Sequence, residues 1–201
     1  MTADRKRFDA TIAAFDAANA EDPNLDEGRP KELLYAQRMS AMLDRFAPDA
    51  SEVVRLAVRA QHIQRWKTPR ASYPMDRQGY LQWRTGLYRF HAETAGRIMA
   101  ETGYDAGTIE QVKAAVGKKG LKVNAETQLL EDVTDLVFLE HYLADFAARH
   151  PDYDEAKWIE ILRKTWQKMS QPARDFVLAG KVGLPETARP LILKAVNPAG
   201  G

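Results

Sequence analysis

The clearest chemical signal in the chain is an acid that the sequence predicts to be buried. Asp132 lies in the run Leu129–Glu140, where a spacing of three and four residues places it on one helical stripe with leucines. An ionised carboxylate on an apolar face is costly unless a metal, a cation or several hydrogen-bond donors meet it. We therefore expect partners for Asp132, and the candidates elsewhere in the chain are Tyr35, Gln61, His62, Arg84 and His91.

His91 is the first of these partners. On a helix predicted over residues 78–102, it shares an inward stripe with Leu81, Arg84 and Tyr88. A histidine together with a carboxylate is the minimum for a metal site or for general acid–base chemistry. Two interpretations stay open, because a buried ion pair between His91 and Asp132 could equally serve only to orient two helices.

His62 is the second histidine of interest. It follows Gln61 at the end of the third predicted helix, where the helix dipole favours a cation. It is either an ordinary residue at a helix end or a further member of the site. His141 and His150 lack a comparable setting, since one adjoins Glu140 on a long helix and the other only precedes a proline.

A basic and aromatic stretch lies between the two histidines. Its cations are Arg65, Lys67, Arg70, Arg77, Arg84 and Arg89, and its aromatic residues include Trp66, Tyr73, Tyr80, Trp83 and Tyr88. Arginine binds phosphate or carboxylate bidentately, and aromatic faces stack on bases. The stretch indicates a small anionic, nucleotide-like ligand, although core aromatics with arginines paired to surface acids would give the same pattern.

Composition narrows the class of protein. A chain of 201 residues with 45% hydrophobic residues suits one domain, and a net charge of +1 argues against nucleic acid as the partner. No apolar run approaches about 18 residues, so no membrane span is expected, and the N-terminus lacks the apolar stretch of a signal peptide. Cysteine is absent, which excludes disulfides and cysteine nucleophiles and fits a cytoplasmic protein.

The pattern of apolar residues and punctuation predicts an all-α fold without a β-hairpin. Asp49 with Glu52 and Asp152 with Glu155 have the spacing of capping boxes, and Asp105 and Asn124 can cap the helices that follow them. The expected domain is a single helical bundle over residues 31–180, preceded by a helix and loop at 1–30 and followed by a Pro- and Gly-containing tail at 181–201. The predicted helices cover residues 5–18, 31–46, 50–60, 78–102, 106–116, 124–150 and 153–168, with a loop at 67–76.

Six runs of the chain carry a family resemblance: Leu34–Met39, Ala60–Trp66, Ser72–Met75, Tyr80–Arg84, Phe90–Glu93 and Leu130–Glu140. They resemble the domain-of-unknown-function 4202 family, and the resemblance covers residues 31 to 169. That family brings no known function with it.

The order of the predicted helices and the run Gln128–Leu136 carry a more distant resemblance. The run is similar to the closing segment of the HD-type metal-dependent phosphohydrolases, which implies an HD-like helical bundle holding one or two metals over a phosphate ester. The ligand set is degraded. Tyr35 stands where the first histidine would be, and Gln61-His62 replaces the His-Asp pair. Tyrosine and glutamine are poor ligands for a divalent transition metal.

Two functions from different classes follow from this resemblance. As a hydrolase of a small phosphorylated or nucleotide-like substrate, the chain would hold a divalent metal (Mn, Fe, Zn or Ni). Its metal ligands would be His62, His91 and Asp132, its catalytic residues Glu131, Asp132 and His91, and its substrate-binding residues Arg65, Arg70, Arg84, Tyr35 and Gln61. Alternatively, it is a non-catalytic module that binds an anionic metabolite or a partner protein. RNA binding through the arginines is a third reading, which requires a steep salt dependence.

Overall fold

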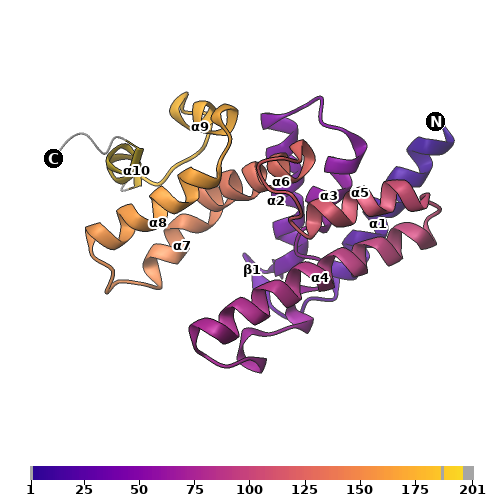
Figure 1. Ribbon diagram of the computed structural model, residues 1–201, viewed down its shortest axis with the longest axis horizontal. Helices are drawn as coiled ribbons and strands as arrows, with labels where there is room; N and C mark the ends of the chain where they lie inside the picture. Colours follow the sequence, from indigo (N-terminus) through magenta and orange to yellow (C-terminus); the bar gives the residue numbers. More distant parts are fainter. Residues whose placement is uncertain (1, 187, 197–201) are drawn as a thin grey trace. The chain divides into compact units, whose positions relative to one another are not determined.

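The fold is all-α, as the sequence predicted. The computed structural model describes residues 2–186 and 188–196, which form ten α-helices, short 3-10 and π segments, and two strands of two residues each (Figure 1). The chain divides into two compact units, Met1–Leu130 (unit 1) and Glu131–Gly201 (unit 2). The domain boundaries expected from the sequence, at residues 30 and 180, are not the boundary between these units and stay a prediction.

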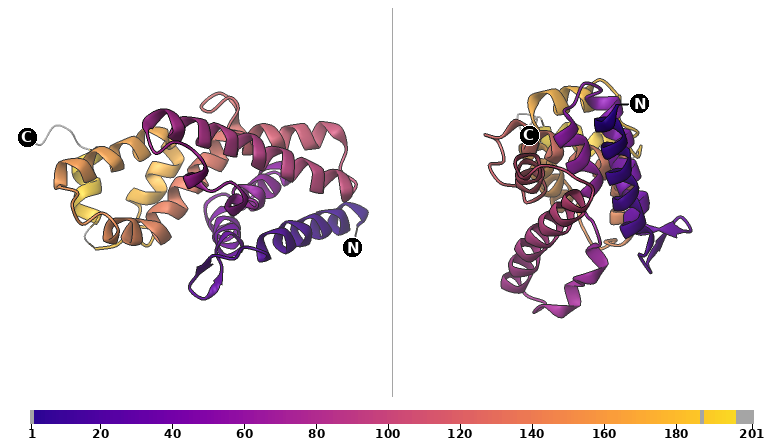
Figure 2. Two further views of the ribbon diagram at one scale, coloured as in Figure 1. Left: turned by 90° about the horizontal axis from the view of Figure 1, so that it is seen from below. Right: turned by 90° about the vertical axis from the view of Figure 1, so that its right-hand side faces the viewer.

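Unit 1 is a cluster of helices around a core of aliphatic and sulfur-containing side chains. Helix α1 packs against α2, α3 and α4, and α5 lies along both α3 and α4 (Figures 1 and 2). Phe15, Met39 and Leu56 are fully buried at the centre. The helices of this unit are α1 (Ala3–Ala20), α2 (Lys31–Phe46), α3 (Glu52–Ala60), α4 (Arg77–Glu101) and α5 (Ala106–Val116), followed by the first residues of α6 (Ala125–Val137).

A small hairpin, which the sequence analysis did not find, precedes α2. Strand β1 (Leu25–Asp26) pairs antiparallel with β2 (Arg29–Pro30), and the two residues between them, Glu27 and Gly28, both have positive φ angles of 52° and 72°. This is the conformation of a tight two-residue hairpin turn, in which glycine is favoured because it lacks a Cβ. Strands of two residues are too short to give an alternating pattern, so the sequence pattern does not predict them.

Two of the predicted N-caps are confirmed, at the helices where only one capping residue is available. The side chain of Asp105 accepts a hydrogen bond from the Thr108 amide at 3.0 Å, and Asn124 accepts from the Thr127 amide at 3.0 Å. For α3, the prediction of Asp49 is wrong, because Ser51 caps the helix by accepting from Val54 N at 3.3 Å.

The predicted cap of the helix after residue 150 is wrong in the same way. Asp154, rather than Asp152, caps α8 (Glu155–Lys168) by accepting from Lys157 N at 2.8 Å. In both cases two good capping residues lie two positions apart, and local propensity does not separate them.

The segment between α3 and α4 is a loop with two 3-10 turns, η1 (Arg65–Lys67) and η2 (Arg70–Ser72). The indole nitrogen of Trp83 donates to the Thr68 carbonyl at 2.8 Å and so fastens the loop to α4. Gly79 makes the close approach possible, since a Cβ at this position would lie 2.1 Å from the Pro74 carbonyl oxygen. The loop predicted at 67–76 is thus present and held in place.

Unit 2 contains the rest of α6, then η3 (Phe138–Tyr142), α7 (Leu143–Ala148), α8, α9 (Gln171–Leu178) and α10 (Ala188–Val196). The single helix predicted over residues 124–150 is interrupted by η3, a π-helical segment with a wider turn. Within the region predicted as a tail, α10 forms and packs against α8 with Ile192 buried. The terminal Pro198, Gly200 and Gly201 lie outside the described residues.

Candidate functional site

Unit 1 brings five of its polar and aromatic side chains together, and we call them the histidine cluster. Helix α2 supplies Glu32 and Tyr35, the turn after α3 supplies His62, η1 supplies Arg65, and α4 supplies His91. The ring centroids of His62 and His91 are 5.8 Å apart. The sequence predicted four of these residues as site members, and the structure places those four near one another.

His91 is a buried, neutral histidine with one unused nitrogen. Only 2% of the residue is exposed, and its Nδ1 lies 2.8 Å from the carbonyl oxygen of Ile63. A carbonyl only accepts, so Nδ1 carries the proton and Nε2 presents a lone pair. Among the described residues, nothing donates a hydrogen bond to that buried Nε2. Burial lowers the pKa of His91 to about 3, so the imidazole is neutral at physiological pH.

His62 is held between a cation and an acid. Its Nε2 lies 3.0 Å from a terminal nitrogen of Arg65, and since a guanidinium only donates, His62 accepts there. Its proton therefore sits on Nδ1, which lies 3.6 Å from a carboxylate oxygen of Glu32. The ring also stacks on Tyr35 with a centroid distance of 4.3 Å. Burial, followed by the charge of Arg65, lowers the pKa of His62 well below its usual value.

Glu32 completes the cluster and was missed by the sequence analysis. The residue is 6% exposed, and burial raises the pKa of its carboxyl to about 7 against the opposing effect of Arg65. Near neutral pH it therefore exists in both protonation states. A signal was present, because Glu32, Tyr35 and Met39 follow the three-and-four spacing of an inward stripe. At the start of a helix, an acid is easily taken for a favourable surface charge instead.

The three arginines predicted to bind substrate have different roles. Arg65 belongs to the histidine cluster, and its guanidinium carbon lies 5.1 Å from the centroid of the Trp83 ring. Arg70 donates to the carbonyls of Tyr73 at 3.1 Å and Asp76 at 3.2 Å, and so it supports the loop.

Arg84 does not lie on an inward face, contrary to the predicted stripe on α4. It is exposed and donates to the hydroxyls of Tyr88 and Tyr80, while Leu81 is 52% exposed. The inward stripe begins only at Leu87, because the first turns of α4 have fewer neighbouring helices to cover them. Gln61, in contrast, is buried at the end of α3, with 4% of its surface exposed.

Unit 2 contains the other predicted site residues, Glu131 and Asp132, together with Asp135. All three are at most 3% exposed, so the predicted burial of Asp132 is confirmed. The carboxylate of Asp132 accepts from the backbone amide of Ser170 at 2.7 Å and from the Ser170 hydroxyl at 2.5 Å. Several donors thus meet this acid, which is one of the ways in which a buried carboxylate is stabilised.

Glu131, predicted as a general base, takes part in an ion-pair network. The ammonium group of Lys168 lies 2.9 Å from Glu131 and 2.6 Å from Asp135. Burial lowers the pKa of Lys168, but the charges of Asp135 and Glu131 outweigh that effect and raise it. Lys168 and Ser170 could not be recognised as partners from the sequence, since both lie more than thirty residues away from the acids along the chain.

The donor groups fit a divalent metal only in part. The free Nε2 of His91 is a good ligand, but Nε2 of His62 already accepts from the guanidinium of Arg65, whose charge opposes a second cation. Among the described residues, no three His, Asp or Glu side chains are grouped so that they could hold a metal ion. His62 and His91 belong to unit 1 and Asp132 to unit 2, so the predicted three-ligand site stays a prediction.

Comparison with known proteins identifies the family. The model of the family described as "Domain of unknown function (DUF4202)" matches residues 9–192, and the chain belongs to this family. No curated protein and no solved structure matches the chain. In the described part of the chain, no helix has the length and apolarity needed to cross a membrane.

Proposed function

We propose that unit 1 binds a small phosphorylated ligand that also carries a hydroxyl group, and that the histidine cluster is its binding site. The observation that carries this proposal is the buried Nε2 of His91, to which no described residue donates a hydrogen bond. A buried acceptor without a donor is costly, so such a group is commonly completed by a ligand or by water. A ligand hydroxyl is a donor of the required kind.

The charges around the cluster favour an anion for the rest of the ligand. Arg65, Lys118 and Lys31 all lower the pKa of His62, which means that their positive potential reaches the imidazole. Arg65 uses one terminal nitrogen on His62, and a guanidinium carries five N–H donors in a planar fork. It is therefore suited to hold phosphate oxygens while it continues to orient His62.

The proposal can be tested with two probes that differ only in their hydroxyl groups. Glycerol 3-phosphate carries phosphate and hydroxyls, whereas methyl phosphate lacks the hydroxyls. We expect isothermal titration calorimetry to show that the protein binds glycerol 3-phosphate about tenfold more tightly, the amount that one good hydrogen bond contributes. Equal affinity for the two probes, or no binding of either, would contradict the proposal.

Two variants separate the part of the site that binds the hydroxyl group from the part that binds the phosphate. His91→Asn keeps a donor for the Ile63 carbonyl and removes the Nε2 acceptor, so it should abolish the preference between the probes. Arg65→Gln should weaken both probes equally. The matched control is Arg97→Gln on α4, where the exposed arginine pairs with Glu101, and both affinities should be unchanged.

A metal-dependent phosphohydrolase is the second candidate, favoured by the suitability of the same His91 nitrogen as a metal ligand. Its predicted ligands are His62, His91 and Asp132, and its predicted base is Glu131. Elemental analysis of protein purified without chelator tests this candidate. Near-stoichiometric manganese, iron, zinc or nickel that is lost in folded Asp132→Ala would support it. If the wild-type protein is folded and contains no metal, the hydrolase candidate is excluded and the binding function remains.

A further inference from the structure

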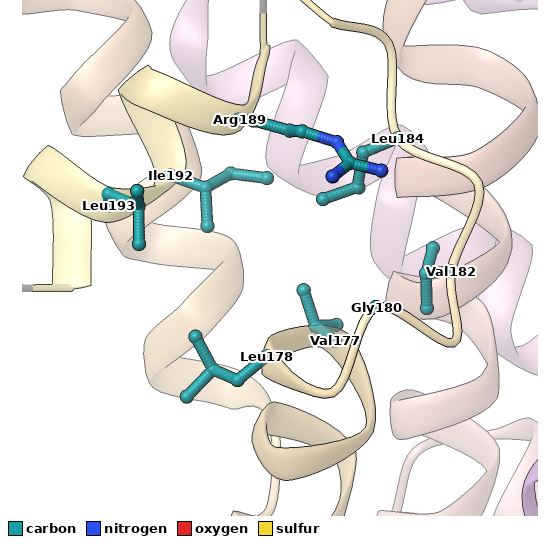
Figure 3. Close-up of a pocket in the computed structure, with 8 residues that line it drawn as sticks. All are labelled: Val177, Leu178, Gly180, Val182, Leu184, Arg189, Ile192 and Leu193. Carbon is teal, nitrogen blue, oxygen red and sulfur yellow. The ribbon is translucent and has the colours of Figure 1, made fainter.

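A second candidate site lies in unit 2, far along the chain from the histidine cluster. The end of α9, the loop that follows it and α10 enclose a cavity of about 150 Å³ that is open on one side (Figure 3). Its walls are aliphatic. They comprise Val177, Leu178, Val182, Leu184, Ile192 and Leu193.

Two of the aliphatic walls are open to solvent. Leu178 on α9 is 55% exposed and Leu193 on α10 is 54% exposed, on either side of the cavity (Figure 3). Gly180, which has a φ of 70°, turns the chain between α9 and the loop, and the cavity has no side chain at that point. An apolar ligand could therefore enter without displacing a core residue.

The lining of the cavity also includes one cationic side chain, that of Arg189. The side chain of Arg189 extends from α10 across the cavity toward Leu184 (Figure 3). It is exposed, and within residues 2–186 and 188–196 it makes no ion pair, not even with Glu186 three positions earlier. By contrast, Lys194 on the same helix pairs with Glu155 at 2.6 Å. Arg189 thus has its full charge available at the rim of an aliphatic cavity.

We infer that this cavity binds a small apolar monocarboxylate, with the carboxylate on Arg189 and the hydrocarbon part between α9 and α10. Charge complementarity requires an anionic head group, and a guanidinium matches a carboxylate bidentately. The volume sets the size, because an aliphatic cavity of about 150 Å³ holds one benzene ring. The ligand therefore has an apolar part of about six to eight carbons, as in benzoate or octanoate.

Titration of the 201-residue chain with octanoate tests the inference, with octan-1-ol as the neutral analogue. We expect octanoate to bind at least tenfold more tightly than octan-1-ol, and Arg189→Gln to remove that difference. The matched control is Arg163→Gln, an exposed arginine on α8 that does not line the cavity, and it should bind octanoate like the wild type. Both substitutions are at exposed positions and should leave the fold intact.

Three results would overturn the inference. One is equal binding of octanoate to wild type and Arg189→Gln, and another is no binding of octanoate or benzoate at millimolar concentration. The third is concentration-dependent dimerisation in sedimentation velocity that Leu193→Glu abolishes, since the cavity would then be covered by a second copy of the chain. None of these results bears on phosphate-ester binding in unit 1, because Arg189 is not part of that site.

Discussion

The buried carboxylates of unit 2 and the buried Glu32 of unit 1 are stabilised in different ways. In unit 2, Glu131 and Asp135 share the ammonium group of Lys168, and Asp132 accepts two hydrogen bonds from Ser170. In unit 1, a carboxylate oxygen of Glu32 lies 3.6 Å from Nδ1 of the neutral imidazole of His62, and the charge of Arg65 only partly offsets the effect of burial. The acids of α6 are thus met by a cation or by two donors at hydrogen-bond distance, whereas the ring in contact with Glu32 is uncharged.

This difference indicates that the acids of α6 form a structural network, whereas the histidine cluster of unit 1 is a site that can respond to a proton or a ligand. A buried carboxylate with a cation beside it stays ionised and fixes the packing of the helices that carry it. Glu32 instead has a pKa raised to about 7, and in the same cluster the buried Nε2 of His91 has no donor among the described residues, so this site can still take up a proton or a ligand. Chemistry or binding is therefore expected in unit 1, although Asp132 of unit 2 gave the stronger sequence signal.

The largest expected effect is the removal of the shared cation in unit 2. Lys168→Met leaves Glu131 and Asp135 without their ammonium partner, and we expect a loss of about 3 kcal/mol in the free energy of unfolding, with solvent at the lysine limiting the cost. Urea denaturation followed by tryptophan fluorescence measures it. The control is Lys164→Met, whose pair with Glu160 is exposed, so its loss in the free energy of unfolding should be much smaller. Equal losses would show that the network is not structural.

The next effect is the pH dependence conferred by Glu32. Its folded-state pKa of about 7 is above the ordinary value of 4.5, so it favours folding below pH 4.5, and this contribution is lost as the pH rises through 7. Glu32→Gln removes the dependence. Relative to wild type, the free energy of unfolding of this variant should rise by about 2 kcal/mol between pH 4.5 and 8, which is somewhat less than the full linkage value.

Urea denaturation at the two pH values provides the test for Glu32. His91, whose pKa is lowered to about 3, contributes stability that is lost as the pH falls below 6.5. That contribution is present in both proteins and cancels in the difference. Glu101→Gln, at an exposed position on α4, should show no such change with pH. A constant difference between Glu32→Gln and wild type would mean that Glu32 is paired like the acids of unit 2.

The smallest effect concerns the hydrogen bonds of Asp132. Ser170→Ala removes the hydroxyl that donates to this carboxylate and that also accepts from the Ala173 amide at the start of α9. We expect the free energy of unfolding to fall by only about 1 kcal/mol, since the backbone amide of residue 170 continues to donate to Asp132. Ser170→Thr keeps the hydroxyl and should be close to wild type in urea denaturation. A loss of similar size in Ser170→Thr would assign the effect to packing.

Local pattern was sufficient for most of the helices up to Lys168 and for the burial of Asp132 and His91, but it did not predict α9 or α10. Asp132 and His91 were correctly predicted as buried because each lies on a stripe of apolar residues with helical spacing. Caps were placed two residues early at α3 and α8, where two capping residues compete. The turn at Glu27–Gly28 gave no signal, because strands of two residues have no period.

The partners of the buried residues could not be predicted, because tertiary packing decides them. Lys168 and Ser170 meet the acids of α6 only when the end of α8 folds back on that helix. Arg84 was predicted to face inward because its spacing fits the stripe, but periodicity does not show how far along α4 the neighbouring helices extend. Glu32 was overlooked because its position at a helix start offered a simpler explanation.

The π-helical segment Phe138–Tyr142 has a consequence for how this family can vary in length. A π-helical turn holds more residues than an α-helical turn, so a one-residue insertion is accommodated locally and the side chains before Val137 and after Leu143 keep their faces. Relatives with one residue fewer at this point should therefore form an uninterrupted α-helix with the same buried leucines on either side. Alignments of the family should place a single-residue gap here, where a helix interior would otherwise forbid it.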